Sequence, residues 1–167
     1  MSCPYIPDVI ELSAYKGDYH KYEQAIFHAF EESFANKELV FRELRIAHKK
    51  HPEYNGKSYT FWHIISDGKG QNEIPDMRRY ERVAWAGFIL ENCVDNCERL
   101  RIWENKRGWH QRILIWCVDA EYLIVLEKRE QQDYVILWTA YPVNRNHTKR
   151  KLEKEYYEYK AKTAQKH

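Results

Sequence analysis

The sequence lacks the features that define several large classes of protein. No run approaches the roughly 18 consecutive apolar residues of a membrane-spanning helix. The first residues, MSCPYIPDVIELS, have neither the charged start nor the apolar stretch of a secretion signal. The four cysteines (Cys3, Cys93, Cys97 and Cys117) show no CxxC spacing, so we expect free thiols and no zinc site. These absences predict a cytoplasmic protein with no membrane partner.

Two kinds of catalytic motif are also missing. The DGKG segment is too short for a glycine-rich phosphate-binding loop, and no helix pattern follows it in the required position. Asp119, Glu121 and Glu127 come nearest to a carboxylate cluster, but Arg129 stands where an ExK motif carries its lysine. A metal nuclease needs two or more acids that converge on a divalent ion. We therefore expect no metal and no other cofactor.

Charge and aromatic residues are plentiful and unevenly placed. Lys and Arg total 27 against 25 acids, so the net charge does not identify a partner. Residues 1–36 carry six acids and two bases, whereas residues 144–167 carry eight bases and three acids. The 13 tyrosines and 6 tryptophans exceed the needs of a small core. We expect the C-terminal end to face an anion and some rings to form surface platforms.

Hydrophobic periodicity predicts three helices. Residues 18–36 place apolar side chains near a 3.6-residue period, behind Asp18 as a suitable N-cap. Residues 76–94 begin after Pro75 and carry two arginines and two apolar residues along one line. That line consists of Arg78, Arg82, Trp85 and Ile89. Residues 147–162 form a polar helix with a sparse apolar line.

The remaining segments read as extended chain. Residues 39–44 and 58–66 are expected as strands or short extended pieces. Three β-rich runs follow, at 111–118, 121–129 and 133–143, and their short connectors favour antiparallel hairpins. The order of elements predicts an α+β fold.

At 167 residues the chain is the size of one domain. We divide it into an N-terminal helical extension (1–57), a sheet-based core (58–143) and a basic C-terminal helix (144–167).

The last strand ends in two hydroxyl-bearing residues. Side chains alternate along a strand, so one face is expected to carry both hydroxyls behind an apolar pair. That face consists of Val135, Leu137, Thr139 and Tyr141, and Tyr134, Ile136 and Trp138 form the other. Thr139 and Tyr141 either satisfy the last carbonyls of the sheet or line a site.

Three further positions could carry chemistry. His63, in FWHIIS, is either a core histidine or a general acid or base, since imidazole titrates near neutral pH. Arg78 and Arg82 either are structural, with Glu81 paired to Arg78, or hold a phosphate, which planar guanidinium groups suit. Arg129 ends the middle strand, close to the two hydroxyls if the last two strands pair.

Five segments, taken in order, resemble a known superfamily. They are FWHIIS, RRYERVAW, YLIVLEKR, YVILWTAYPV and KRKLEKEYYEYK, within residues 58–160. The combination resembles the ribonuclease toxins of the barnase/EndoU/colicin/RelE type that phages and mobile elements encode. Residues 1–57 carry no segment of this kind, and the long N-terminal helical region departs from the RelE branch.

The resemblance implies a fold and an activity. Helices pack on a curved antiparallel sheet of about four strands, and RNA lies across the exposed face of that sheet. Members cut RNA without a metal, through attack by the 2′-hydroxyl, which leaves a 2′,3′-cyclic phosphate. An antitoxin or immunity protein is the second expected partner.

Site residues carry over by position in the resembling segments. The expected catalytic residues are His63, Arg78, Arg82, Arg129, Thr139 and Tyr141. His63 acts as acid or base, the arginines hold the phosphate, and Thr139 and Tyr141 bond a phosphoryl oxygen or the leaving group. We expect Trp103 and Trp109 to stack unpaired bases, and Lys149 and Arg150 in the basic tail to contact the backbone.

Two other functions remain open. A non-catalytic RNA-binding module would use the same basic and aromatic surface, and its arginines would matter for affinity while His63 would not. A protein-interaction module, such as an inhibitor, would use arginine and tyrosine as interface anchors.

Overall fold

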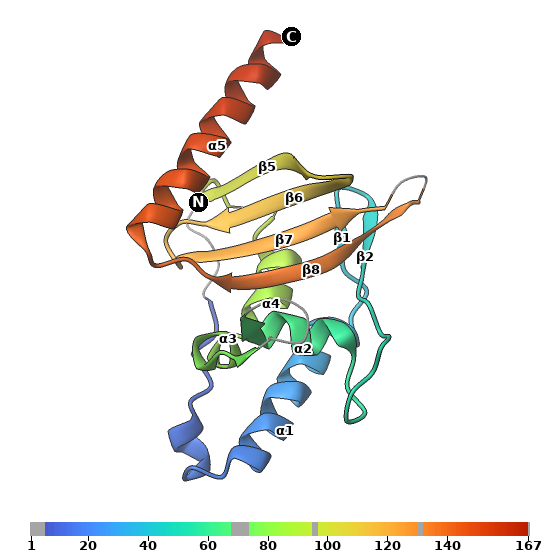
Figure 1. The fold of residues 1–167 in the computed structure, drawn as a ribbon, viewed down its shortest axis with the longest axis vertical. Helices are drawn as coiled ribbons and strands as arrows, with labels where there is room; N and C mark the ends of the chain where they lie inside the picture. Colours follow the sequence, from blue (N-terminus) through green and yellow to red (C-terminus); the bar gives the residue numbers. More distant parts are fainter. Residues whose placement is uncertain (1–5, 68–73, 95–96, 130–131, 167) are drawn as a thin grey trace.

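The computed structural model describes residues 6–67, 74–94, 97–129 and 132–166. These residues form an α+β fold with a curled, mostly antiparallel main sheet (Figure 1). The main sheet consists of β1 (Val40–Phe41), β2 (Leu44–Ala47), β8 (Tyr134–Pro142), β7 (Tyr122–Lys128), β6 (His110–Cys117) and β5 (Leu100–Arg107), in that spatial order. The described part of the chain thus builds a six-stranded sheet, wider than the expected four strands.

Strands β5 to β8 form a continuous antiparallel meander, which confirms the predicted hairpins. β5 was not predicted, because LRIWENKR reads as a polar connector. β2 joins the free edge of β8 in parallel, from Arg45 opposite Tyr134 to Ala47 opposite Ile136. Beyond Ile136, no described strand pairs with that edge of β8. β1 then pairs antiparallel with β2 through a turn at Arg42 and Glu43, both with positive φ.

Helices fill the segments around the sheet. The described α-helices are α1 (Tyr19–Phe30), α2 (Tyr59–Ile65), α3 (Met77–Glu81), α4 (Trp85–Asn92) and α5 (Asn146–Gln165). A 3₁₀ turn, η1 (Leu12–Tyr15), precedes α1, and a π-helical turn, η2 (Glu31–Ala35), continues it. Asp18 caps α1 as predicted, because its carboxylate accepts a hydrogen bond from the Lys21 amide. A short pair, β3 (Ser66–Asp67) and β4 (Ile74–Pro75), lies beside α2 and α3.

The prediction that 58–66 is extended is wrong, because most of this segment forms α2. Ser58 accepts a hydrogen bond from the Phe61 amide and so caps the helix. Phe61, Ile64 and Ile65 are buried at i, i+3 and i+4, the spacing of a helix face. The β-forming residue types concealed this helical spacing.

The predicted helix over 76–94 is also interrupted. It begins as expected, with Asp76 as the N-cap of α3, but α3 ends at Glu81 and α4 begins at Trp85. The Arg82 amide bonds the Arg79 carbonyl, while the Arg82 guanidinium bonds the Arg78 carbonyl at 3.1 Å. The side chain thus takes the acceptor that the amide would use in a continuous α-helix.

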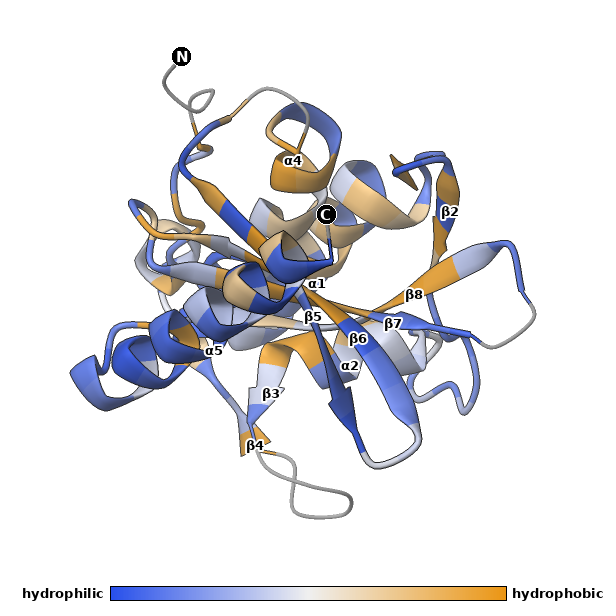
Figure 2. Cartoon of the chain, turned by 90° about the horizontal axis from the view of Figure 1, so that it is seen from above, coloured by the Kyte–Doolittle hydropathy of each residue, from blue (hydrophilic) through white to orange (hydrophobic). Residues whose placement is uncertain are grey.

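The sheet separates two cores. On one face, α1 to α4 pack against residues such as Ile113, Ile115 and Ile124. On the other face, α5 packs through Leu152 against one end of β5, β6 and β7 (Figure 1). Figure 2 shows that α5 is hydrophilic along most of its length, as is the turn end of the β5–β6 hairpin. A helix therefore covers only part of this second face.

A β-bulge in β8 overturns the predicted alternation. Val125 pairs with Thr139 but Leu126 pairs with Leu137, so Trp138 is an extra residue in the ladder. Leu137 lies in the α1–α4 core, whereas Tyr141 packs with the α5 core. Leu137 and Tyr141 do not share a face, because the extra residue shifts the alternation of side chains by one position.

The cysteines follow the prediction only in part. Cys93 and Cys117 are free and buried, and burial raises the pKa of both thiols. Cys97 is disulfide-bonded, which corrects the expectation of a free thiol there. The lack of CxxC spacing does not prevent pairing between cysteines distant in sequence. Cys3 lies outside the described residues. Within the described ranges, no helix combines the length and apolar character needed to cross a membrane.

Candidate functional site on the open sheet face

Four charged side chains meet on the part of the second face that α5 leaves open. Along β6, Arg112 lies on the same side as Leu114 and Trp116, and along β7, Glu127 lies on the same side as Leu123 and Val125. Because Arg112 pairs with Glu127, the two side chains are neighbours. His110 at the start of β6 and Arg129 just after β7 complete the group. We call His110, Arg112, Glu127 and Arg129 the sheet-face cluster.

Glu127 is the centre of this cluster. One of its carboxylate oxygens lies 3.3 Å from His110 Nδ1 and 3.4 Å from an Arg129 guanidinium nitrogen, and the other lies 3.8 Å from Arg112 Nε. Its side chain is only 1% exposed. A buried carboxylate persists only where cations compensate its lost hydration. Two guanidinium groups supply that compensation here, and the His110 imidazole contacts the same carboxylate.

The cluster retains positive charge and unused acceptors. One carboxylate against two guanidinium groups leaves a surplus of one positive charge, or two when His110 is protonated. The cation distances exceed the roughly 2.7–2.9 Å of a strong charge-assisted hydrogen bond. Neither carboxylate oxygen of Glu127 has a hydrogen-bond partner among the described residues. Such a group attracts an anion, and its carboxylate oxygens remain able to accept hydrogen bonds.

An aromatic contact connects His63 to the cluster. The Arg112 guanidinium carbon lies 5.4 Å from the centre of the Trp138 ring, and the His63 ring lies 5.1 Å from the same ring. His63 also stacks on Tyr59, at 5.6 Å between ring centres. The structure therefore brings His63 and Arg129 to one region of the sheet, with Trp138, Arg112 and Glu127 between them. His63 itself is half-buried.

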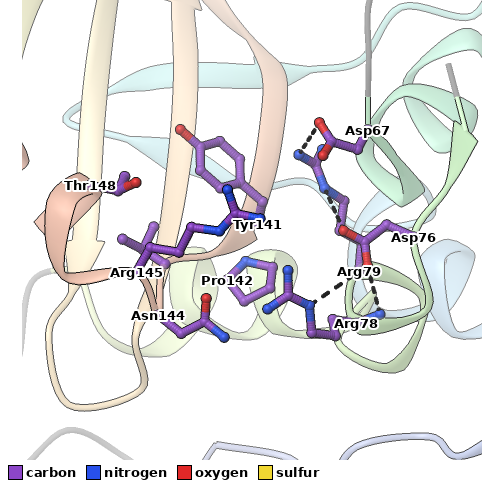
Figure 3. A pocket seen from close by; sticks show the side chains of 10 residues that line it. Asp67, Asp76, Arg78, Arg79, Tyr141, Pro142, Asn144, Arg145 and Thr148 are labelled. Carbon is purple, nitrogen blue, oxygen red and sulfur yellow. Dashed lines mark hydrogen bonds and ion pairs between the residues drawn. The ribbon is translucent and has the colours of Figure 1, made fainter. Parts of the chain in front are cut away.

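A cavity of about 410 Å³ lies at the other end of β8, where α3 meets the connection to α5 (Figure 3). We call it the Tyr141 pocket. Arg78, Arg79 and Arg145 line it, together with Asp67 and Asp76. The guanidinium carbon of Arg79 lies 5.0 Å from the centre of the Tyr141 ring.

The Tyr141 side chain lines the pocket and lies within electrostatic reach of Arg112 in the cluster. Burial raises the pKa of Tyr141, while the guanidinium groups of Arg79, Arg107 and Arg112 act in the opposite direction. Burial prevails, so the hydroxyl stays protonated and can donate a hydrogen bond at neutral pH.

The predicted catalytic residues are thus divided. Arg129 belongs to the sheet-face cluster, and Arg78 and Tyr141 line the pocket. Arg82 is not a lining residue; it pairs with Glu81 at 3.1 Å and lies over the Trp85 ring. The pairing with Glu81, considered for Arg78, is thus made by Arg82. Arg79, which had no expected role, lines the pocket, whereas Arg82 does not. Thr139 pairs with Val125 beside the bulge and does not line the pocket.

The predicted RNA-binding residues also differ in their surroundings. Trp103 is 1% exposed and its indole N–H donates to the Glu155 carboxylate at 2.9 Å, so the stacking role expected for it is wrong. It is a core residue because its strand face is covered by α5. Trp109 is 95% exposed at the β5–β6 turn. Lys149 pairs with Glu121, and Arg150 is exposed on α5.

Four relevant residues had no assigned role from sequence: His110, Arg112, Glu127 and Arg79. A usable signal existed for Glu127 and Arg129, which stand two residues apart and so share a strand face. In the described ranges, no group of three His, Cys, Asp or Glu side chains is placed to hold a metal ion.

Comparison with known proteins gives no match to any family model, curated protein or solved structure.

Proposed function

We propose that the protein is a metal-independent, toxin-like endoribonuclease that cleaves RNA through attack by the 2′-hydroxyl. One observation carries the proposal. A buried carboxylate with unused acceptors, an imidazole and two guanidinium groups meet on a sheet face that no described helix covers at that end.

These groups match the needs of the reaction. The 2′-hydroxyl must lose a proton as it attacks phosphorus, the 5′-oxygen must gain one as it leaves, and the phosphorane between them carries extra negative charge. Glu127 is the base for the first step and His110 the acid for the second. Arg112 and Arg129 hold the non-bridging oxygens, for which planar guanidinium groups are suited. The product is a 2′,3′-cyclic phosphate.

Access to Glu127 is compatible with its burial. His110, which covers one of its oxygens, is itself 56% exposed, and Arg129 is 34% exposed. A substrate whose phosphate oxygens draw these two side chains away leaves the carboxylate oxygen able to accept from the 2′-hydroxyl. Because DNA has no 2′-hydroxyl, the mechanism selects RNA.

His63 acts in this proposal through its neighbours. Its ring supports Trp138, and Trp138 supports the guanidinium group of Arg112. It is therefore a positioning residue. Trp109, exposed next to His110, offers a base-stacking platform beside the cluster.

The test is incubation of the purified protein with mixed RNA in excess EDTA, followed by analysis of the fragment ends. We expect cleavage that leaves 2′,3′-cyclic phosphates. Loss of cleavage in the presence of chelator, or equal cutting of DNA, would refute the proposal. Growth arrest on expression, relieved by the product of a neighbouring gene, would support a toxin with an antitoxin or immunity partner.

The roles are tested by Glu127→Gln and His110→Ala. General acid–base groups contribute roughly 10²–10⁴-fold to rate, so each variant should lose activity in that range while still binding RNA. Glu98→Gln, at an exposed position, is the matched control for the change of acid to amide. Full activity of Glu127→Gln would remove Glu127 from the mechanism.

A non-catalytic RNA-binding module is the second candidate. The exposed Trp109 favours it, because a stacking platform needs no chemistry. It predicts RNA binding without fragments under any condition, so the same incubation decides between the two.

A further inference from the structure

We propose that the Tyr141 pocket is a second RNA subsite, which binds a nucleotide on the same strand as the scissile phosphodiester but outside the sheet-face cluster. The inference rests on the proposed ribonuclease function and adds a binding site that no residue of the cluster contributes to.

The charges of the pocket favour a phosphate. Three guanidinium groups (Arg78, Arg79 and Arg145) face two carboxylates (Asp67 and Asp76), which leaves a surplus of one positive charge. Arg79 is already engaged: it donates to the Ser66 carbonyl at 2.7 Å and lies 3.5 and 3.8 Å from the two carboxylates. The surplus therefore belongs to the outer pair, Arg78 and Arg145.

The outer pair has capacity for a ligand. Among the described residues, the Arg78 side chain has one distant carboxylate contact, with Nε 3.9 Å from Asp76, and Arg145 makes no ion pair. Figure 3 shows the two side chains extending into the pocket from opposite sides, with Tyr141 and Pro142 between them. Two guanidinium groups in this arrangement can bind one phosphate from both sides. The protonated Tyr141 hydroxyl and the Thr148 hydroxyl add donors at the same pocket.

The size of the pocket favours a nucleotide over a free anion. At about 410 Å³ it falls within the roughly 300–1,000 Å³ of small-molecule sites and exceeds what one phosphate fills. Asp67, Asp76 and Asn144 present acceptors beside the arginines, which suit ribose hydroxyls and base amino groups. A mixed lining of this kind matches a phosphate with its attached sugar and base.

The position of the pocket relates it to the cluster. Ile136, opposite Glu127 in the sheet, is five residues from Tyr141 along β8. At about 3.3 Å per residue this is roughly 16 Å, a distance that a few nucleotides of single-stranded RNA can span. Arg107 and Arg112 lie near enough to Tyr141 to act on its pKa. The cations near Tyr141 thus include Arg112, a member of the cluster.

The experiment compares two substrates and one binding probe. The substrates are a dinucleotide, which occupies only the cleavage site, and an oligonucleotide long enough to reach the pocket. The probe is the same oligonucleotide with 2′-O-methyl groups, which cannot be cleaved. Arg145→Ala and Arg78→Ala are the test variants, and Lys21→Ala, exposed on α1 and outside both the pocket and the basic C-terminal helix, removes the same charge as a control.

We expect each pocket variant to weaken binding of the methylated probe by roughly tenfold, as for loss of a charged hydrogen bond. The ratio of kcat/KM for the oligonucleotide to kcat/KM for the dinucleotide should fall by a similar factor, and Lys21→Ala should change neither quantity. An equal effect on both substrates, or no effect on the probe, would overturn the subsite. If the wild type cleaves no RNA, the ribonuclease proposal fails on its own, and probe binding alone then decides the pocket.

Discussion

Two tryptophans on one hairpin should respond to mutation in opposite ways. Trp103 is 1% exposed, packs 5.7 Å from the Tyr156 ring and donates to Glu155. Removal of a buried tryptophan side chain costs about 3–5 kcal/mol, so Trp103→Ala should lower the free energy of unfolding by this amount. Trp103→Phe keeps an aromatic ring at this position but loses the hydrogen bond from the indole N–H to the Glu155 carboxylate. It should cost about 1.5 kcal/mol, the low end for such a bond, because Asn105 still donates to the same carboxylate.

Trp109 should show the converse. At 95% exposure its replacement by alanine should change stability by less than about 0.5 kcal/mol. It should weaken binding of single-stranded RNA by about 1–3 kcal/mol, the contribution of one stacked base. Urea unfolding followed by circular dichroism measures stability, and fluorescence anisotropy with an uncleavable labelled RNA measures affinity. A stable Trp103→Ala, or RNA affinity unchanged in Trp109→Ala, would refute the respective half of this reasoning.

Three other predictions concern packing, pH and the aromatic support of the cluster. A Cβ on Gly87 would lie 2.1 Å from the Ser33 carbonyl oxygen, so Gly87→Ala should destabilise by about 3 kcal/mol or more in urea unfolding; an unchanged midpoint would contradict the close helix contact. Burial and then Lys50 lower the pKa of His48 below its ordinary 6.5. The unfolded chain therefore binds the His48 proton more tightly than the folded chain does. The free energy of unfolding should fall as pH drops below about 6.5, and it should fall less steeply in His48→Phe. An equal dependence of stability on pH in the two proteins would exclude His48 as a cause. Trp138→Ala should reduce kcat by about tenfold to a hundredfold with a smaller change in KM, since Arg112 loses its support, and Trp138→Phe should restore part of kcat; an unaltered kcat in the alanine variant would contradict the positioning role.

Segments with strong local signals were predictable. The first helix follows from apolar spacing and a capping aspartate, and Asp18 does cap α1. The hairpins of β6, β7 and β8 follow from three β-rich runs with short connectors, since neighbouring strands joined by tight turns pair antiparallel.

Other segments depend on tertiary contacts that the local sequence does not contain. In α2, β-branched and aromatic residues favour a strand, but Ser58 caps a helix there and the Phe61 face is buried in the core. The break between α3 and α4 depends on the hydrogen bond from the Arg82 guanidinium to the Arg78 carbonyl. β2 joins β8 in parallel across a long stretch of chain, and no local pattern predicts such a pairing.

The candidate site was predictable at single positions but not as a group. Arg129 was expected at a strand end near the site, and it contacts Glu127. His110 looked like an exposed histidine in a polar segment, and only the β6–β7 register places it and Arg112 around Glu127. The bulge at Trp138 then moves Tyr141 to the face opposite its predicted apolar partner Leu137. Register and bulges are properties of paired strands, which the pattern along one strand does not determine.

The role of the sheet-face cluster is tested most directly with a DNA oligonucleotide that contains one ribonucleotide. The wild-type protein, in EDTA, should cut this chimera only on the 3′ side of the ribonucleotide and leave a cyclic phosphate there, and Glu127→Gln should be slower by roughly 10²–10⁴-fold. Cleavage at other positions, or a Glu127→Gln variant as fast as the wild type, would contradict 2′-hydroxyl attack assisted by Glu127.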